Sequence, residues 1–259
     1  MSKFHSLLQN ELISYKISNE HMITNPIKLS EKEIKICELL KEIIRENKLE
    51  NIELRIFGGW VRDHLLNIPI NDIDILIKGI DPKTFVELIQ KFLNKPKFFM
   101  ANSELKRPNE IKANLTKTQI YDAMIDFVEL SGEIKEDIKN RDFTFNAIYY
   151  NILENKIEDF LGNGINDLKN GIIRRNQLFV NEPMHILRML RFASRFQFII
   201  DDECLIEIEN NKDIIKDSFL NKISIERIQR EMYKILTSLI LHLQYIHFIN
   251  LIYLIQFYK

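Results

Sequence analysis

The sequence predicts an α/β fold for the first part of the chain and an all-helical fold for the rest. Strand-like runs of alternating or consecutive apolar residues occupy 52–57, 73–77 and 121–130. Apolar residues recur every three to four positions, as in amphipathic helices, in 30–44 and 82–94. Later in the chain only the helical spacing recurs, in 182–198, 201–216 and 224–239. Strands interleaved with helices and then helices alone are typical of an α/β domain followed by a helical one.

Composition and charge set the outer limits. With 259 residues, of which 46% are hydrophobic, the chain can bury the core of one large domain or two small ones. Its formal net charge of −1 excludes a globally basic nucleic-acid-binding protein, although a local basic stripe would still hold a polyanion. Cys37 and Cys204 lie far apart in the sequence, so neither a disulfide framework nor a zinc site is indicated.

The two ends of the sequence bear on location. Residues 1–29 carry no secretory signal and no Arg-rich transit peptide, so we expect an intracellular protein of the cytoplasm, with the nucleus or a mitochondrion as alternatives. The segment 239–258 is long and apolar, but His242, Gln244 and His247 argue against a membrane span. We therefore expect no membrane partner and packed helices there, which either form a homodimer or cap the helical region.

Two of the predicted helices carry N-terminal signals. Ser30 precedes an acidic first turn and Asp81 precedes Pro82, so both are predicted N-caps. The Lys- and Asn-rich connection 102–118, which follows the second of these helices, is expected to hold one strand.

The functional prediction starts at a glycine pair. Gly58 and Gly59 follow the first strand and precede a helix-like segment from Trp60 to Leu66. Because they lack Cβ atoms, backbone amides can approach a phosphate closely, and the helix turns its positive N-terminal end toward the same anion. Taken alone, a glycine pair before a helix is more often only a turn.

Two aspartates open the next strand. Asp72 and Asp74 are two residues apart, and side chains alternate across a strand, so both carboxylates lie on one face. They repel each other unless a cation lies between them, and a hard divalent ion such as Mg²⁺, shared with substrate phosphates, satisfies both. Asp-x-Asp alone occurs by chance in many chains. Joined to the glycine pair at this spacing, it indicates a site for Mg²⁺ and a nucleoside triphosphate.

These motifs resemble the head-domain signature of class II tRNA nucleotidyltransferases, the CCA-adding enzymes and their relatives the bacterial poly(A) polymerases. The resemblance is carried by Gly58-Gly59-Trp-Val-Arg62-Asp63-x-Leu-Leu followed by Asp72-x-Asp74, and the Gly-Gly-Trp form is similar to the eukaryotic branch. It implies an α/β (α+β) nucleotidyltransferase head with a mixed β-sheet, followed by an all-α neck and a truncated body. The implied domains are an N-terminal arm, the catalytic head and a nucleotide- and RNA-binding neck with truncated body, at 1–29, 30–161 and 162–259.

A third carboxylate follows in the run 121–130. On spacing alone, Asp126 is either a third metal ligand reached from a neighbouring strand or a solvated strand end. Ile125-Asp126-Phe-Val-x-Leu resembles the family's Asp-Phe-Val-Asn-Leu-Arg segment, which favours the ligand, although Ser131 replaces the arginine.

The second family motif would add phosphate- and ribose-binding groups. Arg141-Asp142-Phe-Thr-x-Asn146-Ala resembles Arg-Arg-Asp-Phe-Thr-x-Asn-Ala. On a helix, Asp142 and Asn146 would share a face beside Arg141. By itself the pattern indicates only a capped, charged helix start. Only residues 131–140 separate it from the preceding strand, where relatives carry a long loop that acts as a lever when the pocket switches from cytosine to adenine.

A third motif spans 159–174, and we expect its Asp167 to be a favourable charge at a helix N-terminus.

The helix at 182–198 carries a basic stripe, in which His185, Arg188, Arg191 and Arg195 recur every three to four residues. It resembles the family's Glu-Asp-x-x-Arg and Arg-x-x-Arg-Phe motifs, which select the base without a nucleic-acid template. A carboxylate accepts from the amino group shared by cytosine and adenine, and a donor faces the adjacent ring nitrogen. Guanine and uracil would place an acceptor against the carboxylate and a donor against the donor, so neither would bind well.

At the template positions this chain has Glu182 and His185. The carboxylate is one methylene longer than the family's aspartate, and the imidazole lacks the arginine's fork and permanent charge, so weaker or altered base discrimination is expected. The alternative for His185 is an ordinary polar residue on a helix surface. Farther along, Glu226 and Arg227 match the family's last motif and are expected to stabilise the neck.

The resemblance thus implies template-independent addition of CCA, from CTP and ATP, to the tRNA 3′ end by two-metal nucleotidyl transfer. The expected catalytic residues are Asp72, Asp74 and Asp126, the first two as Mg²⁺ ligands. The expected nucleotide-binding residues are Gly58, Gly59, Arg62, Arg141, Asp142, Asn146, Glu182, His185, Arg188 and Arg191.

Three alternatives stay open. A CC-adding, A-adding or poly(A)-adding enzyme of the same fold is favoured by the short 131–140 connection and the altered template. A non-catalytic RNA-binding descendant would not need carboxylates facing RNA phosphates. A small-molecule nucleotidyltransferase would share Asp-x-Asp but would not need the basic helix.

Overall fold

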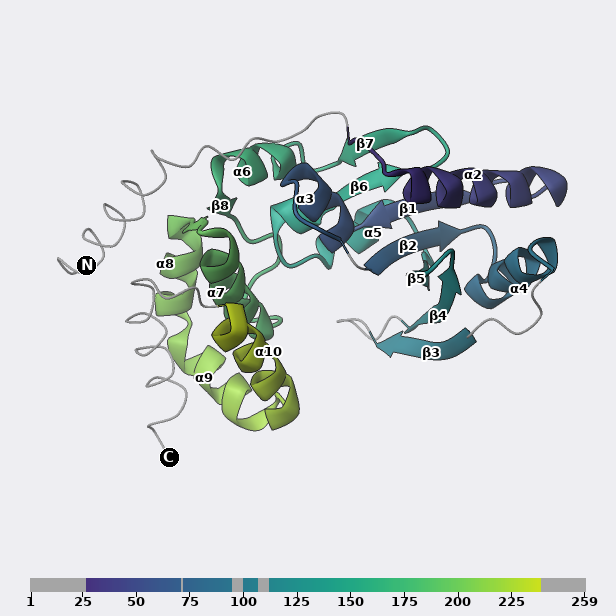
Figure 1. Cartoon of the computed structure of the whole chain (residues 1–259). Helices are drawn as coiled ribbons and strands as arrows, with labels where there is room; N and C mark the ends of the chain where they lie inside the picture. The colour runs from purple at the N-terminus through teal and green to yellow at the C-terminus, as the bar shows by residue number, and fades with distance from the viewer. Residues whose placement is uncertain (1–26, 71, 95–99, 107–111, 239–259) are drawn as a thin grey trace. The chain divides into compact units, whose positions relative to one another are not determined.

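The computed structural model describes residues 27–70, 72–94, 100–106 and 112–238 (Figure 1). These residues fall into two compact units. The head unit contains the described residues up to Arg141 together with 145–165, and the helical unit contains 142–144 and the described residues from Asn166 onward. Most of the predicted arm and the apolar segment 239–258 lie outside the described residues.

The head unit is built on a seven-stranded mixed sheet with the order β3-β4-β5-β2-β1-β6-β7. Its strands are β1 (Glu53–Phe57), β2 (Asp72–Lys78), β3 (Met100–Lys106), β4 (Lys112–Ile120), β5 (Ala123–Glu129), β6 (Ile148–Asn151) and β7 (Lys156–Asp159). Only β2 and β5 pair in parallel, and every other neighbouring pair in this sheet is antiparallel. The predicted α+β class with a mixed sheet is confirmed. The connection 102–118 contributes to two strands, β3 and β4, where the sequence predicted one.

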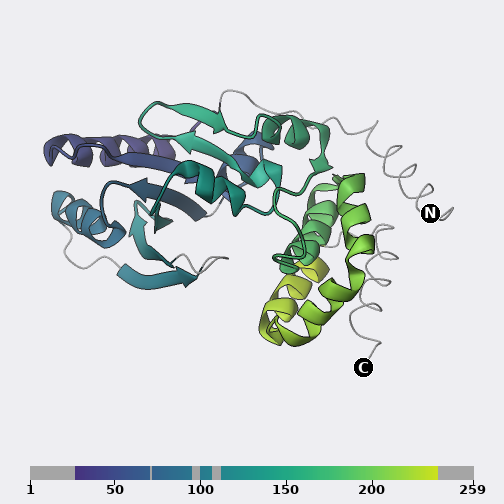
Figure 2. The same cartoon turned by 180° about the vertical axis from the view of Figure 1, so that it is seen from behind.

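Three helices cover one face of this sheet, namely α2 (Glu31–Glu46), α3 (Gly59–Leu65) and α4 (Pro82–Phe92) (Figures 1 and 2). The ring of Trp60 in α3 lies 5.6 Å from that of Tyr150, and Phe85 in α4 lies 5.6 Å from Phe127. Both predicted N-caps are confirmed. The Ser30 side chain accepts from the Glu33 amide within a capping box, and Asp81 accepts from the Thr84 amide.

The opposite face carries the short helix α5 (Ile134–Lys139). Ile138 packs there into a buried cluster with Phe57, Leu76, Val128 and Tyr149. The residues 131–140, which the sequence indicated only as a short connection, therefore contain a helix anchored to the sheet. Burying an isoleucine side chain contributes about 2 kcal/mol, enough to hold so short a helix in place.

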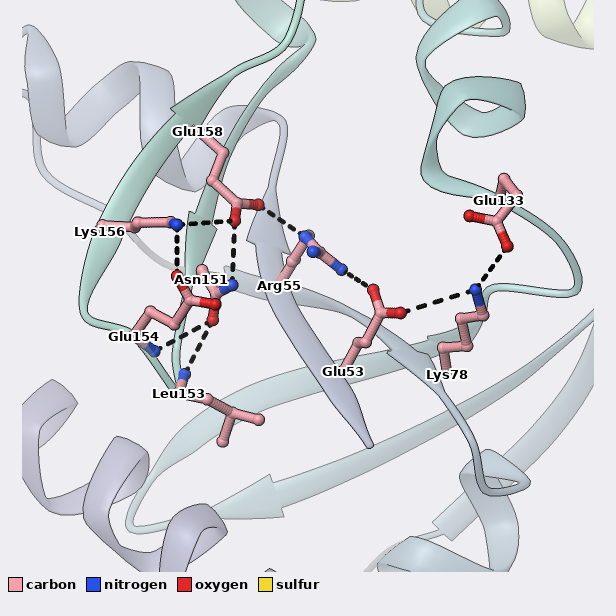
Figure 3. Close-up of polar contacts among 9 residues, drawn as sticks. All are labelled: Glu53, Arg55, Lys78, Glu133, Asn151, Leu153, Glu154, Lys156 and Glu158. Carbon is pink, nitrogen blue, oxygen red and sulfur yellow. Dashed lines mark hydrogen bonds and ion pairs between the residues drawn. The ribbon is translucent and has the colours of Figure 1, made fainter. Parts of the chain in front are cut away.

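A row of ion pairs crosses the sheet on this same face (Figure 3). Arg55 lies between Glu53 and Glu158, with Nε 2.6 Å from the Glu158 carboxylate. Lys78 lies 2.9 Å from Glu133, the residue just before α5. Lys156 completes the row beside Glu158, at 4.0 Å. Within this row Glu53 and Lys78 face each other on the neighbouring strands β1 and β2, 3.6 Å apart, which favours cross-strand pairing, whereas Arg55 reaches past β6 to Glu158 on β7.

The helical unit contains α7 (Met184–Phe196), α8 (Asp202–Asn210), α9 (Lys212–Asn221) and α10 (Ile225–Ser238). Helix α6 (Gly164–Asn170) precedes them, and β8 (Ile172–Ile173) pairs in parallel with β9 (Ile199–Ile200). The helix predicted over 201–216 is in fact two helices, which meet at Asn211. Within the described residues no helix is long and apolar enough to cross a membrane.

Candidate active site

The glycine turn lies where β1 leads into α3. Gly58 has a φ of +68°, a conformation that favours glycine, and no atom lies within 4 Å of the place where its Cβ would be. Gly59 is the first of the seven residues of α3. The backbone of the head unit is therefore open at this turn, which agrees with the predicted close approach of a ligand. Phosphate binding by the two glycines stays a prediction.

The three predicted carboxylates lie on one face of the sheet. In the parallel pair of β2 and β5, Asp74 is opposite Asp126, and Asp72 is opposite Met124. Since side chains alternate along a strand, Asp72, Asp74 and Asp126 point to the same side. Asp72 is exposed, whereas Asp74 and Asp126 are half-buried. The register thus makes Asp74 and Asp126 neighbours.

The electrostatics of Asp74 fit a bound cation. Burial and the nearby charge of Asp126 raise the pKa of Asp74 to about 6, while Arg141 and Lys117 oppose the rise. A carboxyl group that is this costly to ionise is stabilised when a divalent ion with oxygen ligands binds it. Asp74, Asp126 and Asp72 are the carboxylates that would hold such an ion.

Asp126 also has a partner that the sequence analysis missed. Lys117 is opposite Asp126 in the antiparallel pair of β4 and β5, and its Nζ forms an ion pair with that carboxylate. Alternation along β4 could have placed Lys117 on this face, but only the register shows which carboxylate it meets. Among the described residues, no three His, Cys, Asp or Glu side chains converge as a ready metal site. Lys117 occupies one oxygen of Asp126, so a metal would bind the other oxygen or displace Lys117, and the third-ligand role stays a prediction.

Arg141 is fixed directly after α5. Its Nε lies 2.9 Å from Asp137, its guanidinium lies 4.0 Å from the centre of the Phe57 ring, and the Tyr149 hydroxyl donates to the same Asp137 carboxylate at 2.8 Å. Burial alone would lower the pKa of Arg141, but Asp137 raises it, so the guanidinium stays charged, and its charge acts on Asp74. The i, i+4 spacing of Asp137 and Arg141 was visible in the sequence and could have predicted this pair.

Arg62 and Asn146, both predicted to bind nucleotide, meet in the head unit. Arg62 Nη1 donates to Asn146 Oδ1 at 2.8 Å, and Arg62 Nε donates to Asp63 at 2.7 Å. All three side chains are buried. Arg62 therefore has a structural role, holding α3 to the residues just before β6, whatever it contributes to a triphosphate.

The predicted helix through Arg141, Asp142 and Asn146 is wrong. The chain bends at Asp142 and then forms a single 3₁₀ turn, η1 (Thr144–Asn146), because Phe143 and Phe145 are both fully buried and hold it there. Asp142 and Asn146 do not share a helix face, and they belong to different units. In the helical unit, Asp142 Oδ2 accepts from Arg188 Nε at 2.7 Å and lies 2.6 Å from Arg188 Nη2.

The predicted basic stripe of α7 is largely neutralised. Arg188 is paired with Asp142, and Arg191 donates to Glu231 of α10 at 2.8 Å with both side chains nearly buried. Arg195 is exposed and lies over the ring of Phe196. Arg191 thus fastens α10 to α7, and the nucleotide-binding roles of Arg188 and Arg191 stay predictions.

Glu182 and His185 lie at the start of α7. Glu182 Oε1 is 3.1 Å from Arg227 Nη2 of α10, so Arg227 has the predicted structural contact within the helical unit. His185 is only 9% exposed, and its Nδ1 has no hydrogen-bond partner in the described part of the chain. Burial lowers the pKa of His185, so its imidazole is neutral near neutral pH. The alternative interpretation of His185, an ordinary polar residue on a helix surface, is therefore wrong.

Two buried carboxylates of the helical unit make contacts that the sequence analysis did not predict. Asp167 accepts from the Thr144 hydroxyl at 2.7 Å and pairs with Arg174 at 3.2 Å, which is more than the helix-end charge that was predicted. Glu207 accepts from the backbone amide of Phe179 at 2.7 Å and pairs with Arg175 at 2.5 Å. Both hold the segment between α6 and α7, and their partners lie too far along the chain for a local pattern to indicate them.

An open glycine turn, carboxylates facing one another on a parallel strand pair and a charged arginine beside them define the head unit as a nucleotidyltransferase head. The comparisons with known proteins agree. Residues 54–174 match the model of the poly A polymerase head domain. The chain belongs to the family of tRNA nucleotidyltransferases and poly(A) polymerases, whose members use divalent metals.

The chain is similar to several named members. It is 34% identical to the mitochondrial CCA tRNA nucleotidyltransferase of Saccharomyces cerevisiae over 90% of this chain and 48% of the relative. It is 37% identical to the mitochondrial enzyme of the same name from Candida glabrata, over 82% of this chain and 45% of that protein. The chain therefore spans about half the length of these curated relatives.

Solved structures show the same likeness. A CCA-adding enzyme in complex with CTP matches 88% of this chain and 49% of its own, with a TM-score of 0.60 and 27% identity. The Thermotoga maritima CCA-adding enzyme in complex with tRNA matches 86% of this chain and 50% of its own, also with a TM-score of 0.60 and 27% identity.

Proposed function

We propose that this chain is a template-independent tRNA nucleotidyltransferase that extends the tRNA 3′ end with CCA from CTP and ATP. The observation that carries the proposal is the register of β2 and β5, which sets Asp74 opposite Asp126 with Asp72 on the same face. The relatives named CCA tRNA nucleotidyltransferase, and the similar enzymes solved with CTP and with tRNA, support the choice of substrates.

In the proposed reaction Asp72 and Asp74 hold Mg²⁺, with Asp126 as the third carboxylate. When bound, the ion polarises the attacking 3′-hydroxyl and neutralises charge on the leaving pyrophosphate. The raised pKa of Asp74 is consistent with this role, since an uncompensated carboxylate there is unfavourable.

The chain's own residues would bind and orient the nucleotide. Arg141 is a permanent charge held rigidly beside Asp74, which suits a triphosphate oxygen. The Gly58–Gly59 turn leaves room for phosphate against the backbone, and Arg62 holds the helix that follows it. Asp142 and Asn146 remain candidates for ribose contacts, and Glu182 with His185 for reading the base.

A second candidate, addition that stops after CC, is favoured by one observation. Helix α5 fills the connection 131–140 and is anchored by Ile138 in the core, so the chain has no long mobile lever at this place. If the switch from cytosine to adenine needs such a lever, this head would stop before the final A. An A-adding or poly(A)-adding product would be recognised in the same assay.

The first experiment incubates purified protein and Mg²⁺ with a tRNA that ends before CCA, supplies each nucleoside triphosphate alone and then CTP with ATP, and measures product length. Extension by CCA supports the main proposal, and arrest after CC supports the second candidate. No extension under any condition contradicts both and favours an RNA-binding descendant. The substitutions Asp72→Ala and Asp74→Ala should abolish transfer, whereas Asp122→Asn, an exposed aspartate at the start of the β5 hairpin, should not.

The homodimer predicted from the apolar C-terminal helices finds no support in the described residues. The segment that would form it, 239–258, lies outside them.

A further inference from the structure

The start of α7 belongs to a small cluster of charges within the helical unit. Arg188 and Asp142 form one ion pair of this cluster, and Glu182 and Arg227 form the other. The buried ring of His185 interacts electrostatically with all four. The two ion pairs differ in how many of their polar atoms have partners, and this difference indicates different roles for them.

In the Arg188–Asp142 pair, both oxygens of the carboxylate already have partners. Two nitrogens of Arg188 meet one oxygen of Asp142, and the other oxygen accepts from the Phe143 amide at 2.8 Å. The Asp142 side chain is 4% exposed. The Arg188 side chain is 37% exposed, but two of its nitrogens are held by a carboxylate whose two oxygens both have partners, so Arg188 and Asp142 are poor candidates for reading a base.

In the Glu182–Arg227 pair, most of the polar atoms have no partner among the described residues. A single contact of 3.1 Å joins Glu182 Oε1 to Arg227 Nη2, and within the described residues neither side chain has another polar partner. The Arg227 side chain is 52% exposed and that of Glu182 is 20% exposed. One carboxylate oxygen and most of the guanidinium fork therefore remain available beside the unpartnered Nδ1 of His185.

We propose that Arg227, from α10, is the charged donor that works with Glu182 to select the base. This inference rests on the proposed function. The oxygen of Glu182 accepts from the exocyclic amino group of cytosine or adenine, and an N–H of Arg227 donates to the adjacent ring nitrogen. Uracil and guanine present a carbonyl and an N–H in those places, so an acceptor would face an acceptor and a donor a donor.

This assignment explains how the chain works with a histidine at position 185. A neutral imidazole offers one donor without the fork or the charge of arginine. Arg227 brings both from the neighbouring helix, and the buried Arg191–Glu231 pair fixes the position of α10 against α7 within the unit. His185 then serves as a supporting contact to the base or its sugar through Nδ1.

The test compares Arg227→Ala with Arg230→Ala. Arg230 is exposed one turn farther along α10 and has no polar side-chain partner among the residues that the structure describes, so it controls for the lost charge. Single-nucleotide extension of tRNA is measured with CTP and with UTP, and kcat and KM are determined for each. We expect Arg227→Ala to lower the ratio of kcat/KM for CTP over UTP by about tenfold or more. Arg230→Ala should leave the ratio within twofold, and Arg227→Lys should restore it only in part.

Two results would overturn the proposal. One is a ratio in Arg227→Ala that stays within twofold of wild type. The other is a collapse of the ratio in His185→Ala with Arg227→Ala unaffected, which would make His185 the donor. Far-ultraviolet circular dichroism of each variant shows that the helical unit is folded.

The proposal can be separated from the proposed function. If wild-type protein extends no tRNA, the proposed function fails, but calorimetric titration with CTP and with UTP still tests Arg227. A wild-type preference for CTP that disappears in Arg227→Ala supports the inference. The same preference in both proteins, or no binding of either nucleotide, contradicts it.

Discussion

Replacing Asp74 by asparagine should stabilise the metal-free head unit while abolishing transfer. Asp74 Cα is paired with that of Asp126, and burial and that second carboxylate raise the pKa of Asp74 from its ordinary value of 3.8 to about 6. The folded protein therefore binds a proton more tightly than the unfolded chain, and stability falls as the pH rises from about 4 to about 6. Above pH 6 the ionised carboxylate costs about 3 kcal/mol, which asparagine avoids.

The assay is urea unfolding in EDTA at several pH values. Trp60 is the only tryptophan of the chain, is 2% exposed and belongs to the head unit, so its fluorescence follows that unit. We expect Asp74→Asn to exceed wild type in free energy of unfolding by about 2–3 kcal/mol at pH 8 and by less than about 1 kcal/mol at pH 4. Saturating Mg²⁺ should raise the stability of wild type and narrow the difference at pH 8.

Asp72→Asn is the matched control, because Asp72 is exposed on the same strand, and its stability should stay within about 0.5 kcal/mol of wild type. A wild type and an Asp74→Asn variant that are equally stable at pH 8 in EDTA, with no dependence on pH between them, would refute the reasoning. So would an effect of the same size in Asp72→Asn.

Three further predictions use the same fluorescence-monitored unfolding. Asp137→Asn should lower the free energy of unfolding by about 3–5 kcal/mol, because it leaves Arg141 buried without its anionic partner. The control is Glu136→Gln, at an exposed neighbouring position, which should have little effect. Equal losses in the two variants would contradict the pairing. Burial raises the pKa of Glu33, but its hydrogen bonds outweigh burial and lower the pKa to about 2. Wild type should therefore be more stable than Glu33→Gln above pH 4.5 and lose that advantage as the pH falls toward 2. A difference in stability that does not change with pH would contradict this prediction. Arg55→Met should cost about 1–3 kcal/mol at low salt and less at high salt, because Glu53 and Glu158 each lose a cationic partner and, among the described residues, keep only Lys78 and Lys156. A cost that is independent of salt would argue against the electrostatic account.

The face of the sheet that carries the three aspartates could be predicted largely from the sequence, because strand alternation is a local pattern. Strand alternation placed Asp72 and Asp74 on one face, and the same rule placed Asp126 on the polar face of its own strand. What alternation could not supply was the pairing of the strands. The parallel register of β2 and β5, which makes Asp74 and Asp126 neighbours, depends on packing between segments far apart in the chain.

The prediction failed where a tertiary contact overrode a local pattern. The helix through Arg141 and Asn146 does not form, because burial of Phe143 and Phe145 fixes a bend and a 3₁₀ turn instead. Helical spacing on α7 correctly indicated a row of cations, yet Arg191 is neutralised by Glu231, forty positions later in the sequence. Periodicity shows which residues share a face and not which partners that face meets.

The connection between β5 and Arg141 has a first part that is exposed and a second part that is held in place by packing and an ion pair. Helix α5 is held at Asp137 and Ile138, whereas Ser131–Glu133 before it are exposed, and no atom lies within 4 Å of the place where a side chain on Gly132 would be. A segment spliced in at this glycine would extend into solvent, and doubling its length would add only about 0.6 kcal/mol in closure entropy. The head is therefore a natural recipient for chimeras, in which a loop transplanted from a longer relative would show whether product length travels with the loop or stays with the host.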